Sequence, residues 1–115
     1  MRGILLMIGV LLFAAECGDG SVEASVKVFK SRGSLQCIGG GTAPEEMKNE
    51  LIIAGIDVRS SFCGSDGLAH PALCGATDGA INIFEIPQSK AAQAESLGFK
   101  ALSTLPNAQE KQCPR

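Results

Sequence analysis

The chain has 115 residues, which is enough for one domain. It carries 10 Lys and Arg residues against 12 Asp and Glu residues, so its formal net charge is −2, and the two signs are interspersed. Because the sequence has no basic patch, nucleic acid and anionic membrane surfaces are excluded as expected partners.

The first 17 residues have the order of a secretory signal. Arg2 supplies a positive charge, residues 4–13 form an apolar run that only Gly9 interrupts, and two alanines follow. The run is shorter than the roughly 20 apolar residues that a membrane-spanning helix needs. We therefore expect residues 1–17 to be a signal peptide and the protein to be exported, either to the periplasm or out of the cell.

Cys17 comes directly after this segment. The sequence LLFAAEC resembles a bacterial lipoprotein signal, in which the cysteine becomes the acylated first residue. That family has a small residue before the cysteine, and this chain has Glu16. The alternative is ordinary cleavage between Ala14 and Gly18. Membrane association is therefore expected only through the signal peptide or through a lipid on Cys17.

The first predicted elements are a strand and a helix. Residues 25–30, SVKVFK, alternate well enough for a strand. After a glycine-rich loop, Thr42 and Glu45 form a capping box and Pro44 suits the first helical turn. Gly55 is expected to end this helix. Its apolar stripe consists of Met47, Leu51 and Ala54.

Two strands and a loop follow. Residues 56–62 alternate between apolar and polar side chains, which predicts a half-buried strand that ends at Cys63. Residues 64–79 read as a loop with Asp-Gly turn signals. Residues 80–86, AINIFEI, are apolar at both parities, so they predict a central strand that is covered on both faces.

The last predicted elements are a helix, a short strand and a tail. Pro87 opens the helix QSKAAQAESL, Gly98 ends it, and residues 99–102 form the strand. Residues 103–115 are polar and contain two prolines, which predicts a flexible C-terminal tail.

This order predicts a single α+β domain over residues 18–102. It is the split β-α-β pattern of a small ferredoxin-like sandwich, with two helices on a four-stranded antiparallel sheet. A helix-ending glycine followed by an apolar residue occurs twice, at Gly55-Ile56 and at Gly98-Phe99. The alternative makes residues 68–74 an extra strand between two Asp-Gly turns, which Pro71 would confine to a sheet edge.

Four cysteines follow Cys17, and an exported domain of this size gains stability from disulfides. They are Cys37, Cys63, Cys74 and Cys113, and they allow three pairings. We favour Cys63–Cys74 with Cys37–Cys113, and Cys37–Cys74 is the runner-up. In a ferredoxin-like layout, the first three of these cysteines fall at one end of the sheet.

A metal site is the alternative use of the same residues. Cys37, Cys63, His70 and Cys74 form a Cys₃His set, which is a zinc-type ligand set. The loop with Cys37, the helix after it and the sequence Gly-Ile-Asp-Val resemble the layout of heavy-metal-associated domains. That family carries two cysteines two residues apart in the loop, and here no cysteine follows Cys37 at that spacing. The resemblance implies the ferredoxin-like fold and metal binding.

The loop after Cys63 is the candidate binding loop. Its candidate binding residues are Gly64, Ser65, Asp66, Gly67 and His70. The sequence Cys-Gly-Ser-Asp-Gly, with Cys74 after ten intervening residues, is similar to the central signature of Kazal-type protease inhibitors. That family has further cysteines on both sides that this chain lacks. The resemblance implies a protease-inhibiting loop at residues 64–73.

These patterns predict a small exported binding or structural domain that has no cofactor and no catalytic site. Ser65, Asp66 and His70 lie within six residues, whereas catalytic triads usually draw on distant segments. The partner is an unknown protein or small molecule. The alternatives are a thiol-redox or metal-binding protein that uses the Cys₃His set, and a secreted protease inhibitor.

Overall fold

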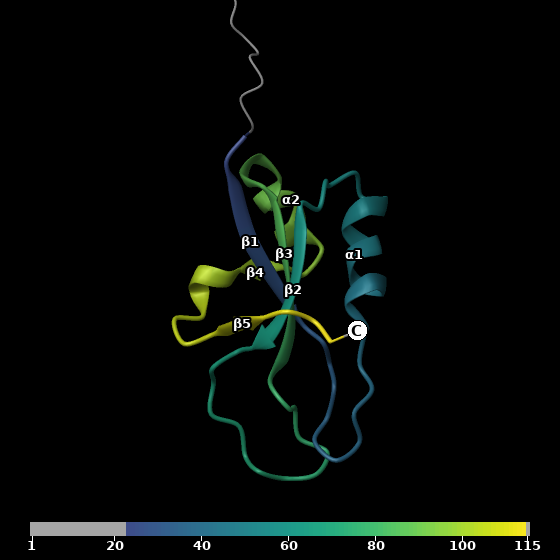
Figure 1. Ribbon diagram of the computed structural model, residues 1–115, viewed down its shortest axis with the longest axis vertical. Coiled ribbons are helices and arrows are strands. Elements are labelled where there is room, and N and C mark those ends of the chain that lie inside the picture. Colours follow the sequence, from purple (N-terminus) through teal and green to yellow (C-terminus); the bar gives the residue numbers. More distant parts are fainter. Residues whose placement is uncertain (1–22, 115) are drawn as a thin grey trace, which may run out of the picture.

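The computed structural model describes residues 23–114 (Figure 1). The predictions for the signal peptide and for Cys17 therefore lie outside the described residues. The strands and helices are, in chain order, β1 (Ser25–Ser31), α1 (Pro44–Ile53), β2 (Ser60–Ser65), β3 (Ala80–Pro87), α2 (Ala91–Ser96), β4 (Lys100–Ala101) and β5 (Gln109–Lys111). Two short 3₁₀ turns complete the set, η1 (Gln88–Lys90) before α2 and η2 (Leu102–Thr104) after β4.

The domain is α+β, with two helices, a five-stranded sheet and two disulfides. The sheet order is β4-β1-β3-β2-β5, and every neighbouring pair is antiparallel. The expected count of four strands is wrong. The fifth strand comes from the segment that the sequence assigned to a tail, because residues 109–111 pair with β2.

The strand β3 is the centre of the sheet, as its composition predicted. It pairs along its length with β1 and with β2. Successive side chains alternate between the two faces, and both sets are buried. Phe84 and Ile86 are fully buried on the face that carries the helices, which we call the helix face. Ile81 and Ile83 are equally buried on the other side, which we call the opposite face.

Both helices end in the same way. The N–H of Gly55 donates to the carbonyl of Ile52, and the N–H of Ile56 donates to that of Leu51. Gly98 and Phe99 repeat this pattern at the end of α2. These are Schellman motifs, in which a glycine with positive φ ends the helix and an apolar residue follows it. The start of α1 differs from the prediction, because Ala43 is the N-cap and no side chain caps the helix.

The main core lies between the helices and the sheet. Its buried members are Val28, Met47, Leu51, Ile56, Phe84, Ile86, Ala94 and Phe99. Phe84 and Phe99 meet edge to face, with ring centroids 5.9 Å apart. The two apolar residues that follow the helix-ending glycines thus belong to this core, which ties each helix end to the sheet.

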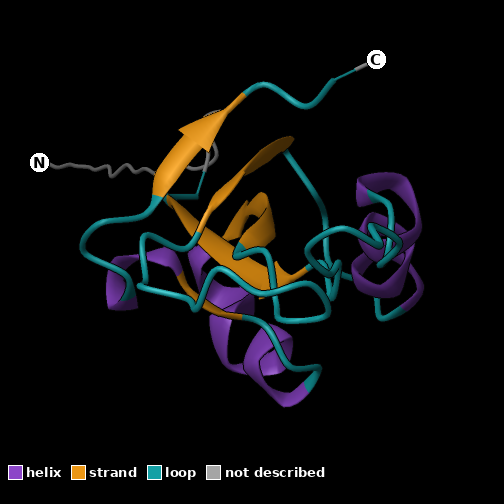
Figure 2. Ribbon diagram, turned by 90° about the horizontal axis from the view of Figure 1, so that it is seen from below, coloured by secondary structure: helices purple, strands orange, loops and turns teal. Residues whose placement is uncertain are grey.

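The opposite face of the sheet is covered by the C-terminal segment rather than by a helix. The strand β5 crosses in front of the sheet (Figure 1), on the side away from α2 (Figure 2). Lys27 of β1 forms an ion pair with Glu110 of β5, with 2.8 Å between nitrogen and oxygen. Because β3 and β2 separate these strands in the sheet order, the sheet must curl to bring them together. The Lys27 ammonium also lies 4.8 Å from the centre of the Phe62 ring.

Two expectations about strand limits need correction. The strand β2 begins at Ser60 rather than at residue 56, because Ile56 turns inward to complete the end of α1. Residues 68–74 are not a strand. They belong to a long loop that runs out from the sheet between β2 and β3.

Candidate functional site

Two long loops project together from one end of the sheet (Figure 1). They are residues 32–43, between β1 and α1, and residues 66–79, between β2 and β3. We call this pair of loops the finger. The two loops come together because β1 and β2 run in the same direction, so both strands finish at the same end of the sheet.

A disulfide joins the two loops of the finger. Cys37 is bonded to Cys74, and Cys63 is bonded to Cys113. The pairing that the sequence favoured, Cys63–Cys74 with Cys37–Cys113, is therefore wrong, and the runner-up is the one found. The reason is that the Cys63 side chain lies within β2, next to β5, where the returning tail can reach it.

Gln36 clamps the finger from inside. Its side-chain amide donates to the carbonyls of Pro71 and Thr77, at 2.7 and 3.0 Å. Its side-chain oxygen accepts from the N–H of Leu73 at 3.0 Å. Its backbone bonds to Gly75 and Ala76 in the same loop. One residue thus satisfies five polar contacts across the two loops, which fixes their conformation before any partner binds.

The base of the finger is tied at Ser34 and Asp78. The Ser34 hydroxyl donates to the Asp78 carboxylate at 2.9 Å, and the N–H of Ala80 donates to the same oxygen. These donors lower the pKa of the Asp78 carboxyl below its ordinary value, and the N–H of Ala80 makes the largest contribution. The charged form of Asp78 is therefore the one that holds the two loops together.

Asp66 and His70, two of the predicted binding-loop residues, bond to each other. The His70 Nε2 lies 2.8 and 3.0 Å from the two Asp66 carboxylate oxygens, and the N–H of Leu68 donates to one of these oxygens. Both side chains are mostly buried, with 21% of the His70 side chain and 15% of the Asp66 side chain exposed. They brace the loop between β2 and β3 from inside, so they do not form its outer surface.

Gly64 and Gly67 let the C-terminal segment pass close to the loop. A Cβ atom on Gly64 would meet the backbone oxygen of Gln109, and one on Gly67 would meet the backbone of Asn107. These two glycines therefore serve close contact between backbones. Ser65, the fifth predicted residue, ends β2 and pairs with Ala80 and Gln109.

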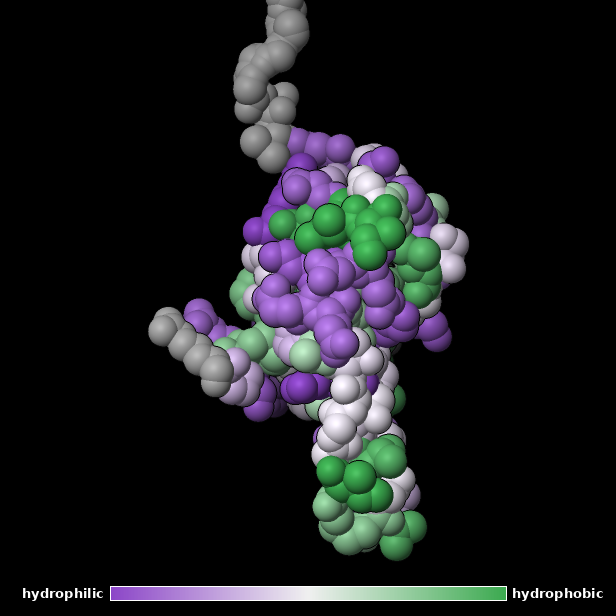
Figure 3. All heavy atoms as spheres, turned by 90° about the vertical axis from the view of Figure 1, so that its right-hand side faces the viewer, coloured by the Kyte–Doolittle hydropathy of each residue, from purple (hydrophilic) through white to green (hydrophobic). Residues whose placement is uncertain are grey.

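The outer part of the finger, residues 33–43 and 67–77, has an apolar surface without charged side chains. Ile38, Leu68 and Leu73 are exposed over 68%, 56% and 62% of their surface. No Asp, Glu, Lys or Arg occurs in residues 33–44 or in residues 67–77. Figure 3 shows the finger as a projection whose end is hydrophobic, below a body on which hydrophilic surface surrounds a separate hydrophobic patch.

The sequence prediction pointed to the loop at residues 64–73, which contains Leu68 and Leu73, but the individual residues that it named are mostly not the ones on the surface. It singled out Asp66 and His70, which lie inside, and it passed over Gln36 and Ile38. The available signal was the absence of charge from both loops, combined with leucines and an isoleucine that follow no helical or strand periodicity.

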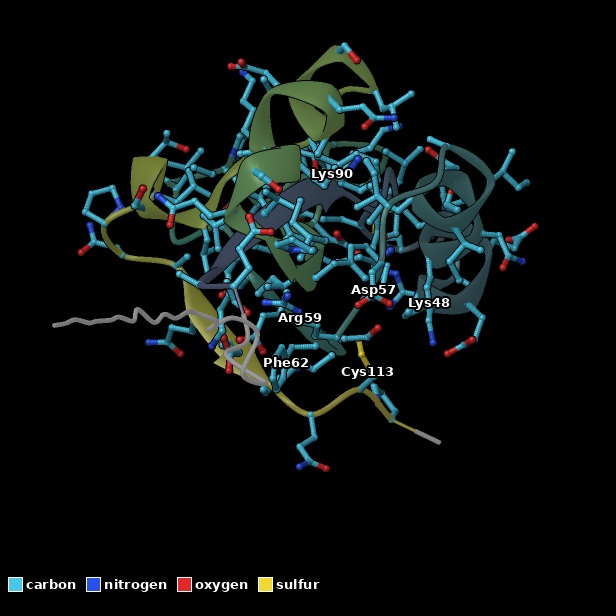
Figure 4. All side chains as sticks on the ribbon, turned by 90° about the horizontal axis from the view of Figure 1, so that it is seen from above. Lys48, Asp57, Arg59, Phe62, Lys90 and Cys113 are labelled. Atoms are coloured by element: carbon cyan, nitrogen blue, oxygen red, sulfur yellow. A yellow bond between two sulfur atoms is a disulfide. The ribbon has the colours of Figure 1, made fainter. Side chains whose placement is uncertain are left out.

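The predicted metal ligands are not brought together as free groups. Cys37, Cys63 and Cys74 are all in disulfide bonds, and His70 bonds to Asp66. Within residues 23–114, no group of three His, Cys, Asp or Glu side chains is arranged to hold a metal ion. The disulfides separate the cysteines into a pair in the finger and a pair beside β5. Figure 4 shows Cys113 where the C-terminal segment returns to the sheet, near Phe62.

Within the described residues, every helix is too short or too polar to cross a membrane. No protein-family model matches the chain, and comparison with curated proteins and with solved structures found no match. The site must therefore be interpreted from its own chemistry.

Proposed function

We propose that this protein is a non-catalytic binding module that inserts the finger into an apolar depression on a partner protein. The observation that carries the proposal is the set of exposed Ile38, Leu68 and Leu73 side chains on the part of the finger that has no charged residue. Contiguous apolar surface of this kind on a small protein marks an interaction site, because its exposure to water is unfavourable.

The rigidity of the finger supports a role in binding. The Cys37–Cys74 bond and the five contacts of Gln36 hold both loops in one conformation. Binding then costs little conformational entropy, because the loops are ordered in advance.

The chemistry of the finger favours a protein over other partners. A surface that inserts into an anionic membrane interface usually combines apolar residues with Lys or Arg, and often with aromatic rings. Residues 33–44 and 67–77 contain no Lys or Arg and no Phe, Tyr or Trp. Nucleic acid is disfavoured for the same reason, since binding to its phosphates depends on cationic side chains.

The test is binding by finger variants. The double substitution Ile38→Ser with Leu73→Ser removes two exposed apolar side chains from the finger. Each side chain that the partner buries contributes about 1.5–3 kcal/mol, so affinity should fall at least tenfold per residue. Partners captured by the wild-type protein are identified, purified and titrated against each variant.

The matched control is Ile53→Ser. Ile53 is 85% exposed, but it lies on α1, outside the finger. The proposal requires a purified partner that binds wild type and the Ile53 variant equally and the double variant at least about a hundredfold more weakly. It fails if no such partner is found, or if the Ile53 substitution weakens binding as much as the double one.

A second candidate function is protease inhibition by residues 64–73. It is favoured by one observation, which is that Gln36 supports the backbone of Pro71 and Leu73 from inside while Leu68 and Leu73 face outward. A rigid exposed segment with leucine side chains suits a protease with an apolar specificity pocket. Inhibition of such a protease that Leu73→Asp abolishes would support it, and failure to inhibit a panel of serine proteases would remove it.

We also propose the ferredoxin-like class and export for this protein. The strand order β4-β1-β3-β2, with α1 between β1 and β2 and α2 between β3 and β4, supports the split β-α-β pattern, and β5 is then an addition at one edge. The two disulfides support export, because such bonds are typical of oxidising compartments.

A further inference from the structure

A groove of about 620 Å³ lies at the base of the finger, on the opposite face of the sheet. The pairing of β1 with β3 and β4 determines which side chains face the groove from the sheet. Phe29 pairs with Lys100, and Ser31 pairs with Ile81, so these four side chains project from one face. The size is within the range of about 300–1,000 Å³ that is usual for small-molecule sites.

The walls of the groove are apolar. Leu68 of the finger lines it on one side, and Leu105, which follows η2, lines it on another. Phe29 is half-buried and lies in the floor, and Ile81 next to it is fully buried. An extended hydrocarbon chain could therefore contact apolar side chains from the sheet, the finger and the C-terminal segment together.

The groove also carries charges, and their partners differ. The Asp66 carboxylate is already bound to His70 and to the N–H of Leu68. The Lys30 ammonium is bound to Glu50 at 2.9 Å and to the carbonyl of Leu97. Lys100, by contrast, lines the groove and has no hydrogen-bond or ion-pair partner within residues 23–114. The charge left to be complemented is thus positive.

We propose that this groove binds an amphipathic carboxylate, a molecule with an unbranched apolar chain and one anionic head. The chain lies on Phe29 between the two leucines, and the head bonds to the Lys100 ammonium. This site does not depend on the partner that the finger binds, although Leu68 belongs to both surfaces.

The test is a titration with decanoate followed by the shifts of backbone amide resonances, because the chain has no Trp or Tyr to report binding by fluorescence. Shifts should concentrate at residues 29–31, 81, 100 and 105. In Lys100→Met, which keeps the apolar stem but removes the charge, the affinity should fall about threefold to tenfold, as expected for an exposed to half-buried ionic contact.

Three comparisons complete the test. Lys100→Arg should bind as wild type does, because it keeps the charge. Lys111→Met is the matched control, since Lys111 is an exposed lysine of β5 outside the groove, and it should also bind as wild type does. Decanol, which lacks the anionic head, should bind several times more weakly than decanoate.

The proposal is overturned if decanoate at millimolar concentration shifts no groove resonance, or if its shifts fall mainly on the finger or on α1. It is also overturned if the Lys100→Met and Lys111→Met variants bind equally, or if decanol binds as well as decanoate. Thermal unfolding of each variant checks that the fold is retained.

Discussion

At the scale of single residues, two different physical requirements place glycine in the finger. Gly67 and Gly75 both have positive φ, at 71° and 94°. A Cβ on Gly75 would meet nothing within 4 Å, whereas one on Gly67 would collide with the backbone of Asn107. At Gly75 only the backbone conformation requires glycine. At Gly67 both the conformation and the close approach of Asn107 require it.

We predict that Gly67→Ala destabilises the protein far more than Gly75→Ala does. A left-handed backbone at a residue with a Cβ costs roughly 1–2 kcal/mol, and that is the whole expected effect at Gly75. At Gly67 the collision with backbone adds to it, for a total of about 3 kcal/mol or more. Urea unfolding measures both, and equal losses would contradict the close approach of residue 107 to the finger.

Asp78 gives the finger a dependence on pH. Its pKa is lower in the folded protein than the ordinary value of about 3.9, because Ala80 and Ser34 donate hydrogen bonds to the carboxylate. Folding therefore favours the charged form. This contribution to stability is complete above the ordinary value and disappears as the pH falls through the lowered one.

We predict that Asp78→Asn flattens the loss of stability in acid. The wild-type protein should lose stability steeply below pH 4, and the variant should lose less over the same interval, because it has no carboxylate to protonate there. Ser34→Ala should give a smaller effect in the same direction, since the bond from the N–H of Ala80 remains. Unfolding by urea at several pH values is the measurement, and parallel curves for wild type and variant would refute the role of Asp78.

At the scale of elements, β5 depends on a covalent bond more than the other strands do. It has three residues, all exposed, and it pairs with β2 only. Its remaining attachments are the Lys27–Glu110 ion pair and the Cys63–Cys113 disulfide. An exposed ion pair contributes little, about 0–1 kcal/mol, so the disulfide is the main restraint.

We predict that the two disulfides can be distinguished by removing each pair. Replacing Cys63 and Cys113 with Ala should lower the free energy of unfolding by roughly 2–4 kcal/mol and should expose the amides of residues 109–111 to hydrogen exchange. Replacing Cys37 and Cys74 with Ser should lower the melting temperature by several degrees and leave those amides protected. Loss of protection in both variants would mean that the finger, too, holds β5 in place.

At the scale of the whole molecule, the two proposed binding surfaces lie close to one end of a small sheet. The finger projects from that end, and the groove opens at its base. The helices lie on the other face and take no part in either surface. Their role is to bury one side of the sheet so that the loops have a rigid support.

We predict the covalent state of the exported protein. Its intact mass should rise by four hydrogen atoms on reduction, because each of the two disulfides takes up two. The mass also identifies the first residue, which should lie after the apolar run at residues 4–13, and it shows whether Cys17 carries a lipid. A protein that keeps Met1, or whose mass does not change on reduction, would contradict export to an oxidising compartment.

Much of the fold could be predicted from local patterns. The two Gly-apolar pairs ended their helices as expected, because a Schellman motif needs only a glycine and the apolar residue after it. The central strand was identified because residues 80–86 are apolar on both sides. The fifth strand was missed, because residues 109–111, QEK, are polar and become a strand only through pairing with β2.

The sequence by itself determined the elements that have a local signal, namely both helices, the central strand and the positions of the loops between them. Only the tertiary structure decided how the cysteines pair and what the finger presents. Cys37 meets Cys74 because β1 and β2 run in the same direction, so the loops that follow them begin at the same end of the sheet. The relative direction of two strands depends on long-range pairing. The burial of Asp66 and His70 was also decided by the tertiary structure. This pair, which the sequence indicated as binding residues, lies inside the loop, and the apolar side chains around it form the outer surface.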